Sequence, residues 1–183
     1  SLKQKIEETL SVIRNHTKEN YPIGIILGTG LGGLVKEINV SHQIEYGDLP
    51  HFPLSTVESH HGKLIFGTIA GKNIVAMQGR FHFYEGYNIN ECIIPVFITH
   101  KLDCRNLLLT NAAGGINKNF TPGDLMLATS LNGILIKKEL TDLIGLTNLA
   151  GKDNFINLPD TEFNNLIKTA AISENINVKE GVY

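Results

Sequence analysis

The chain has 183 residues, with 18 acidic and 16 basic side chains, a formal net charge of −2 and 42% hydrophobic residues. This globular composition excludes disordered and collagen-like chains, and the charge lacks the excess expected of a protein that binds nucleic acid or an anionic membrane. No apolar run approaches the roughly 20 residues that span a bilayer, and two cysteines are too few for a disulfide framework or a zinc site. We therefore expect a cytoplasmic protein.

The first predicted element is an amphipathic helix. Apolar residues recur at helical spacing between residues 2 and 13, with charged residues between them, which predicts a surface helix with one buried stripe. The continuous apolar run 23–27 then predicts a buried strand. Residues 28–33 are rich in glycine, and we expect them to open a second helix at 34–38.

The middle of the chain predicts a β-hairpin followed by a helix. Residues 63–69 and 74–77 have the pattern of two strands, and residues 70–73 supply a turn that contains glycine. Residues 91–102 are apolar nearly all round, which predicts a buried helix. Pro95 is expected near the start of that helix, where its missing N–H costs least.

The last third predicts strands at 106–111 and 124–129, a helix around 166–172 and a final strand that begins at 178. Buried strands that alternate with helices and hairpins are typical of an α/β protein. We expect one α/β domain over residues 1–183, with a mixed, twisted central β-sheet flanked by helices. The chain stops on entering a strand, so we expect this domain to be incomplete at its C-terminus.

The glycine-rich segment 28–33 is the first candidate site. Backbone amides of a glycine turn at a helix N-terminus bind anions, and the hydroxyl of Thr29 adds a donor. The glycine spacing also satisfies the dinucleotide fingerprint, which is weak alone and would indicate an NAD-dependent oxidoreductase. That fingerprint needs an acidic residue after the next strand, and Asp48 lies in a predicted loop instead. A tight turn without a ligand is the remaining alternative.

The second candidate site is segment 79–87, which follows a predicted strand. Arg80 offers a planar fork for a phosphate or a carboxylate. Alternation along an extended chain would bring His82 and Tyr84 to the same side. The alternative is an amphipathic strand end with a surface ion pair between Arg80 and Glu85.

Two further segments carry weaker signals. Residues 111–115 are small and follow a strand, so backbone there can approach a flat ligand or an anion, although a plain turn explains them equally well. His60 and His61 are adjacent and point to different sides of an extended chain, and no third ligand stands at a recognisable spacing. We therefore expect no metal site, and each histidine could equally be structural.

Together these segments resemble the trimeric purine nucleoside phosphorylase family. Its members carry a Gly-Ser-Gly-Leu-Gly phosphate loop, matched by residues 28–32, and a Ser-Thr-Val-x-x-His-x-Gly segment, matched by residues 55–62. They also carry Gly-Arg-x-His-x-Tyr-Glu-Gly-Tyr, matched by residues 79–87. Asn-Ala-Ala-Gly-Gly at 111–115 and Pro-Gly-Asp-Leu at 122–125 complete a series of matches in register.

The resemblance implies a function and a set of site residues. The reaction would be reversible phosphorolysis of the N-glycosidic bond of purine nucleosides, a pentosyl transfer of purine salvage. Phosphate would be the co-substrate, with no cofactor, and the active assembly a homotrimer. The residues implied for phosphate are Thr29, His60, Arg80, Phe81, His82 and Ala112. Those implied for the purine pocket are Ala112, Ala113 and Gly114, with Tyr84 for the ribose and the backbone of Gly28, Gly30 and Gly32 for the phosphate loop.

The chain departs from the family pattern in three places. Thr29 replaces the usual serine, and a threonine also occurs in the related methylthioadenosine phosphorylases. The family's Pro-Gly-His-Ala-Gly is Glu-Ser-His-His-Gly at 58–62, which leaves open whether His60 or His61 faces the phosphate. Family chains also continue beyond the equivalent of Tyr183 with residues that read the purine. Two alternatives therefore stand beside a purine nucleoside phosphorylase: a methylthioadenosine phosphorylase, and an inactive fragment that binds phosphate or assembles.

Overall fold

The computed structural model describes residues 1–54, 62–82, 85–132 and 158–183. These residues form two compact units, residues 1–113 and residues 114–183, and each unit is described by itself. No helix in the described part of the chain has both the length and the apolar character needed to cross a membrane. The prediction of a single domain over residues 1–183 stays a prediction.

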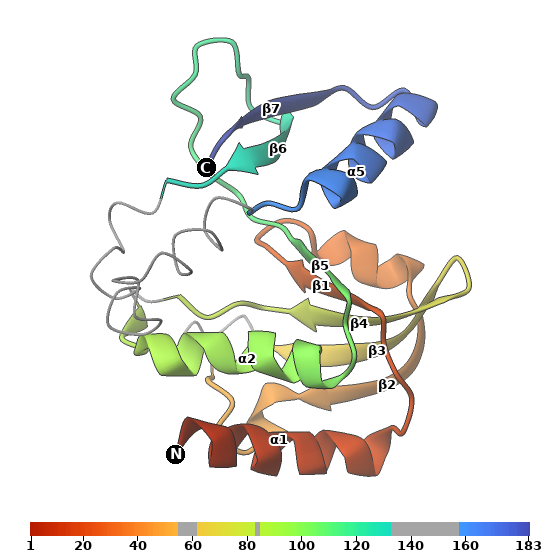
Figure 1. The fold of residues 1–183 in the computed structure, drawn as a ribbon, viewed down its shortest axis with the longest axis vertical. Coiled ribbons are helices and arrows are strands. Elements are labelled where there is room, and N and C mark those ends of the chain that lie inside the picture. Colours follow the sequence, from red (N-terminus) through yellow and green to blue (C-terminus); the bar gives the residue numbers. More distant parts are fainter. Residues whose placement is uncertain (55–61, 83–84, 133–157) are drawn as a thin grey trace. The chain divides into compact units, whose positions relative to one another are not determined.

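The first unit is built on a five-stranded sheet with the order β2-β3-β4-β1-β5 (Figure 1). Strand β1 pairs in parallel with both β4 and β5, whereas β3 pairs antiparallel with both β2 and β4. The predicted mixed sheet is therefore confirmed. The strands are β1 Ile23–Leu27, β2 Asn39–Glu45, β3 Lys63–Ile69, β4 Lys72–Gln78 and β5 Asn106–Leu109.

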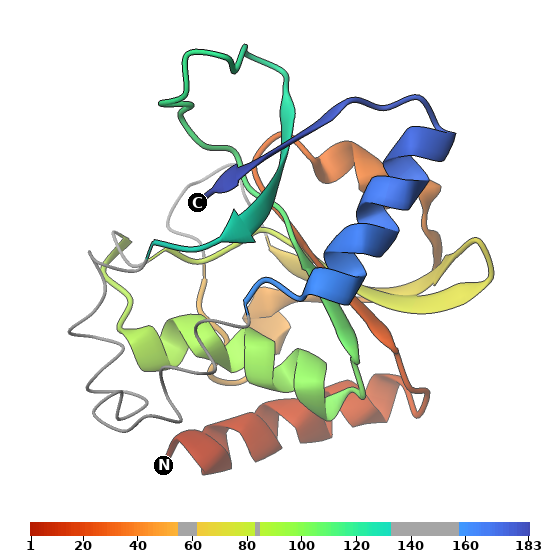
Figure 2. The ribbon, with the colours of Figure 1, turned by 45° about the horizontal axis from the view of Figure 1, so that its top comes forward.

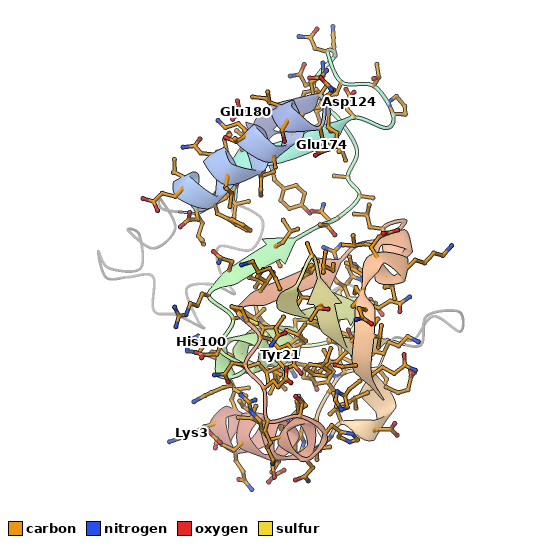
Figure 3. The ribbon with its side chains drawn as sticks, turned by 90° about the vertical axis from the view of Figure 1, so that its right-hand side faces the viewer. Lys3, Tyr21, His100, Asp124, Glu174 and Glu180 are labelled. Atoms are coloured by element: carbon orange, nitrogen blue, oxygen red, sulfur yellow. The ribbon has the colours of Figure 1, made fainter. Side chains whose placement is uncertain are left out.

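Two helices, α1 (Leu2–His16) and α2 (Ile89–Lys101), pack side by side on one face of this sheet (Figure 1 and Figure 2). The ring of Tyr21 lies 5.0 Å from that of Phe66 in the core beneath them, and Figure 3 shows Tyr21 inside this unit. The buried apolar side chains of this layer include Ile6, Ile13, Ile94, Ile98, Leu64, Phe66, Val75 and Met77. The stripe predicted for the first helix is therefore the face that enters the core.

The opposite face of the sheet is covered by a different kind of helix than predicted. Residues Gly32–Glu37 form a 3₁₀ helix, η1, where the sequence predicts an ordinary helix at 34–38. Leu34 and Val35 of η1 pack against buried residues of the sheet, among them Leu27 and Ile74.

Helix α2 differs from its prediction in two respects. It begins at Ile89 because Asn88 and Glu91 form a capping box, so Pro95 stands in the middle of the helix and not near its start. It is also not buried all round, since Val96 is 43% and Phe97 41% exposed. One side of the helix packs against α1 and the sheet through Ile94 and Ile98, and Val96 and Phe97 lie outside this contact.

The hairpin of β3 and β4 has a tighter turn than predicted. Lys72 and Asn73 already belong to β4, which leaves Ala70 and Gly71 as the connection. Both have positive φ, 48° and 74° respectively. That is the geometry of a two-residue type I′ turn, whose twist suits a hairpin.

The second unit contains two parallel strands, β6 (Leu125–Ser130) and β7 (Val178–Val182), and helix α5 (Thr161–Ser173). The side chain of Asp160 caps α5 by accepting a hydrogen bond from Phe163 N–H at 2.7 Å. Asn164 then donates to the carbonyl of Ala128 at 2.9 Å, which joins the helix to β6. The strands and the helix lie where the sequence predicts them.

Candidate functional site at the carboxyl end of the sheet

Three neighbouring parallel strands of the first unit, β4, β1 and β5, end at the same edge of the sheet. Leu27 at the end of β1 pairs with Gln78 at the end of β4, and Ile26 pairs with Leu109 at the end of β5. A segment singled out in the sequence follows each of these strands. In an α/β sheet, ligands bind beyond the carboxyl ends of parallel strands. The topology therefore brings the predicted glycine-rich, arginine and small-residue segments together.

Thr110 holds the start of the glycine-rich loop. Its hydroxyl accepts a hydrogen bond from Gly28 N–H at 2.9 Å and donates to the carbonyl of Ile26, also at 2.9 Å. A Cβ on Gly28 would lie 2.5 Å from the carbonyl oxygen of Thr110, so only glycine fits there. Sequence reasoning missed Thr110, although a hydroxyl that ends the apolar run 107–109 was a signal for it.

Arg80 reaches the same threonine from the other side of β1. Its Nη1 donates to the carbonyl oxygen of Thr110 at 3.2 Å. Because β4 and β5 flank β1, the half-buried guanidinium lies across the end of β1 when it makes this contact. A guanidinium has five N–H donors, so the bond to Thr110 leaves others for an anion. Thr110 thus orients both the arginine and the glycine-rich loop.

His82 and Glu85 form a second polar group on the segment after β4. The Nδ1 of His82 lies 2.6 Å from Oε1 of Glu85, and the same oxygen accepts the backbone N–H of His82 at 3.1 Å. The Glu85 side chain is only 7% exposed, whereas that of His82 is 30% exposed. A carboxylate that accepts from Nδ1 orients the imidazole.

Phe81, between these polar residues, belongs to an aromatic cluster. Its ring lies 5.2 Å from Tyr46, 5.9 Å from Phe52 and 6.0 Å from Tyr87, measured between centroids. The predicted phosphate contact of Phe81 therefore concerns its backbone, and it stays a prediction. The packed ring has a separate consequence: it anchors the chain between Arg80 and His82.

The remaining predicted loop residues are open to solvent. Thr29, Gly30, Gly32, Ala112 and Ala113 are all exposed, so their hydroxyl and backbone groups can reach a ligand. Gly30 has a φ of +84°, a conformation that L side chains rarely adopt. The exposed loops fit an anion site, but the role of each residue stays a prediction.

Four other predicted residues cannot be added to this picture. His60, His61 and Tyr84 lie outside the described residues. Gly114 is the first residue of the second unit and is described with that unit. The assignments to the ribose and to the purine wall therefore stay predictions.

A hollow of about 410 Å³ lies beside the glycine-rich loop. Its lining includes Leu27, Gly30, Leu31, Gly33, Leu34, Glu37 and Thr110. Near it, the carboxamide oxygen of Gln78 is buried and has no hydrogen-bond partner within the described residues. Across the described ranges, no three His, Cys, Asp or Glu side chains are grouped so that they could hold a metal ion. The donors of this region suit an anion better than a cation.

The dinucleotide alternative finds no support in this topology. A dinucleotide-binding fold places the strand that follows the glycine loop beside β1 and parallel to it. Here β4 and β5 occupy both sides of β1, and β2 lies at the far edge of the sheet, antiparallel to β3. Asp48 stands at the end of a 3₁₀ helix, η2 (Tyr46–Asp48), and not at a strand end beside the loop.

Comparison with known proteins identifies a family. The phosphorylase superfamily matches residues 22–183. The chain is 39% identical to purine nucleoside phosphorylase 1 of Bacillus subtilis over 100% of this chain and 67% of that protein. It is 44% identical to the purine nucleoside phosphorylase of Rattus norvegicus over 66% of this chain and 42% of that protein.

A solved structure extends the similarity to the fold. Isoform 2 of purine nucleoside phosphorylase from Schistosoma mansoni, in complex with cytosine and ribose-1-phosphate, superposes with a TM-score of 0.84 and 34% sequence identity. The match covers 98% of this chain and 65% of that chain. The chain thus spans roughly two thirds of the length of its full-length bacterial and structural relatives.

Proposed function

Because the chain belongs to the phosphorylase superfamily and, within it, to the purine nucleoside phosphorylases, we propose that it serves the reversible phosphorolysis of purine nucleosides. The products are the free purine and (deoxy)ribose 1-phosphate, so the enzyme is a pentosyltransferase of purine salvage. We further propose a cytoplasmic homotrimer, in line with the family resemblance. Purine nucleoside and inorganic phosphate are the proposed substrates.

The observation that carries this proposal is the Arg80–Thr110–Gly28 cluster. A cation, a fixed hydroxyl and a glycine-rich loop meet at one edge of the sheet. Preorganised donors of this kind stabilise charge without rearranging during the reaction. We assign the anion of this site to phosphate, with Arg80, the Thr29 hydroxyl, His82 and loop N–H groups as its donors.

The reaction requires what this cluster supplies. A phosphate oxygen forms a bond to C1′ while the bond from C1′ to the purine nitrogen breaks, and the electron pair of that bond leaves with the purine. The sugar passes through an oxocarbenium-like state, as in other glycosyl transfers. The protein must hold the phosphate beside the developing positive charge, so orientation and electrostatics carry the catalysis.

A second candidate function is phosphate binding without turnover. The chain covers 67% of the Bacillus subtilis relative and 65% of the Schistosoma mansoni chain. The described cluster accounts for an anion site, whereas purine recognition rests on residues whose roles stay predictions. An assay of the chain by itself separates the two candidates.

The test measures release of hypoxanthine from inosine, together with phosphate binding by calorimetry, for the chain and for Arg80→Met. Loss of a preorganised donor costs about 2–4 kcal/mol, so we expect turnover to fall roughly 30- to 1,000-fold. Arg105→Met is the matched control, because Arg105 is exposed and precedes the amino end of β5, away from the loops at the carboxyl ends of the strands.

Three outcomes separate the candidates. Turnover that depends on Arg80 supports the phosphorylase. Phosphate binding that depends on Arg80, without turnover, supports the second candidate. A fall of less than about threefold in both properties for Arg80→Met, which is under 1 kcal/mol, would contradict the assignment of the anion site.

A further inference from the structure

Tyr46 is bonded to both ends of the β3–β4 hairpin at the site edge of the sheet. Lys63 at the start of β3 pairs with Gln78 at the end of β4, so Gly62 and Gly79 are the adjoining residues just outside the pair. The N–H of Tyr46 donates to the carbonyl of Gly62 at 2.8 Å. Its hydroxyl donates to the carbonyl of Gly79 at 2.9 Å. One residue, through its backbone N–H and its hydroxyl, therefore spans the point where two predicted phosphate segments meet the sheet.

The ring of Tyr46 explains the glycine at position 62, and backbone conformation explains the one at position 79. A Cβ on Gly62 would lie 2.1 Å from two ring carbons of Tyr46, so no side chain fits there. Gly79 has a φ of +96°, and a Cβ on it would lie 3.2 Å from Gly62 Cα. The tyrosine is 1% exposed, with the rings of Phe52 and Phe81 at 4.9 Å and 5.2 Å. The phenol has no room to leave this position.

The hydrogen bond to Gly79 acts directly on Arg80. The carbonyl of Gly79 and the N–H of Arg80 belong to one planar peptide group, so a bond that fixes the carbonyl also fixes the direction of the N–Cα bond from which Arg80 starts. Burial raises the pKa of the Tyr46 phenol, which keeps its hydroxyl protonated and able to donate. The Arg80 guanidinium in turn donates a hydrogen bond from Nη1 to the carbonyl oxygen of Thr110 at 3.2 Å.

We propose that Tyr46 is a positioning residue for the anion site: its hydroxyl, bonded to Gly79, sets the direction in which the Arg80 guanidinium leaves β4 and reaches Thr110. The inference rests on the proposed function for the identity of the anion. Tyr46 itself does not touch the substrate. It comes from η2, outside the segments that sequence reasoning singled out.

The test replaces Tyr46 with phenylalanine, which removes the hydroxyl and keeps the ring. Tyr21→Phe is the matched control: Tyr21 is also 1% exposed, and its hydroxyl shares a 2.7 Å hydrogen bond with Thr17. Tyr21 precedes β1 and so lies at the end of the sheet away from the loops. A purely structural role would give the two variants the same pattern of effects.

Two readouts are measured on the whole chain. The first is the NMR signal of the Arg80 guanidinium, assigned by its loss in Arg80→Lys. The second is the affinity for inorganic phosphate by calorimetry. In Tyr46→Phe we expect the Arg80 signal to move to the position of a free arginine and phosphate affinity to fall about 3- to 10-fold, the effect of one lost hydrogen bond. In Tyr21→Phe we expect neither change, even where the melting temperature falls.

The two readouts keep this inference separate from the proposed function. An unchanged Arg80 signal in Tyr46→Phe overturns the positioning role, whatever happens to phosphate. An Arg80 signal that moves only in Tyr46→Phe supports positioning even if the chain binds no phosphate, which would overturn the proposed function alone. If Tyr46→Phe does not fold, the unmodified chain still decides: a slowly exchanging Tyr46 hydroxyl proton close to Arg80 Hα supports the inference, and its absence contradicts it.

Discussion

At the scale of single residues, the site depends on contacts too close for any other side chain. Gly28 is held against the backbone of Thr110, and Gly62 lies against the ring of Tyr46. In both places the glycine is explained by a neighbour distant in the sequence and not by a turn. Two of the glycines in the motifs of this chain are therefore explained by close packing against a residue distant in the sequence.

Gly28→Ala should destabilise the first unit and displace the glycine-rich loop. The added Cβ would meet backbone atoms of Thr110 and Asn111 at 2.5 and 2.6 Å, and backbone cannot move aside as a flexible side chain can. Overpacking of this kind costs about 1–3 kcal/mol, measured as the free energy of unfolding in urea. Gly33→Ala is the control, because a Cβ there meets nothing within 4 Å. Equal stability of the two variants would contradict the packing argument.

Cys104 should be nearly inert to alkylation at neutral pH. Burial, aided by the charge of Asp103, raises the pKa of its thiol to about 11. Because the thiolate is the reactive form, alkylation by iodoacetamide should be roughly 300-fold slower than that of an unperturbed thiol with a pKa of about 8.5. The rate, followed by mass spectrometry, should rise as the pH approaches the raised pKa. Free-thiol reactivity at pH 7 would show that Cys104 is accessible and not shielded.

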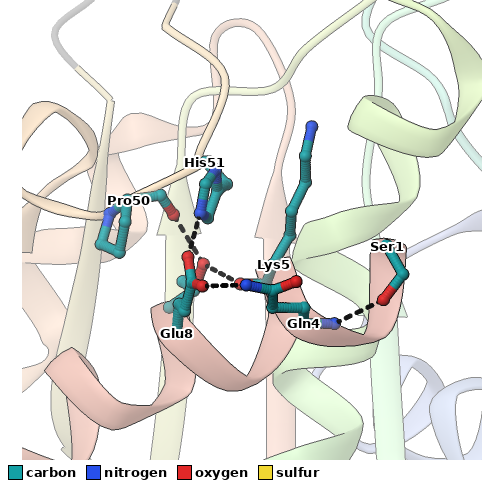
Figure 4. Close-up of polar contacts among 7 residues, drawn as sticks. Ser1, Gln4, Lys5, Glu8, Pro50 and His51 are labelled. Atoms are coloured by element: carbon teal, nitrogen blue, oxygen red, sulfur yellow. Dashed lines mark hydrogen bonds and ion pairs between the residues drawn. The ribbon is translucent and has the colours of Figure 1, made fainter.

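At the scale of elements, α1 holds the irregular segment that follows η2. Oε2 of Glu8 lies 2.5 Å from Nε2 of His51, and the Thr9 hydroxyl donates to the carbonyl of Pro50 at 2.6 Å (Figure 4). The ring of Phe52, two residues beyond Pro50, packs on Tyr46. The helix thus supports the aromatic cluster behind Arg80 through the segment that it binds.

The stability that the Glu8–His51 contact contributes should depend on pH. The hydrogen bond to His51, and then that to Gln4, lowers the pKa of Glu8 in the folded chain. A carboxyl whose pKa is lowered on folding stabilises the fold above its unfolded pKa of about 4.3, and the stabilisation is lost as the pH falls through the folded value. The stability difference between the unmodified chain and Glu8→Gln should therefore be present at pH 6 and shrink below about pH 4.

Urea unfolding at a series of pH values measures this difference. Glu7→Gln is a neighbouring control, because Glu7 lies on the same helix as Glu8 but its carboxylate faces Nζ of Lys101 on α2, at 4.0 Å. No hydrogen bond joins Glu7 to the described residues around His51. If the difference in unfolding free energy between the unmodified chain and Glu8→Gln stays constant from pH 6 to pH 3, the Glu8–His51 contact does not stabilise the fold. A Glu7→Gln difference with the same pH profile would assign the effect to helix charge in general.

At the scale of the whole molecule, most elements were predictable because their patterns are local. The run Ile23–Leu27 is confirmed as β1, and the helical periodicity of residues 2–13 is confirmed in α1. Local patterns failed where neighbours decide the outcome. The segment after the glycine loop forms only the 3₁₀ helix η1, and α2 leaves Val96 and Phe97 exposed.

By itself, the sequence determined the family, the mixed sheet and the segments that meet at its carboxyl edge. The reason is that motifs and strand patterns are local features, carried by consecutive residues. Only the tertiary structure decided what holds these segments in place. Thr110 joins Gly28 to Arg80, and Tyr46 joins Gly62 to Gly79, through hydrogen bonds between residues far apart in sequence. No local pattern encodes such a partner, because it is chosen by the pairing of strands and the close packing of the core.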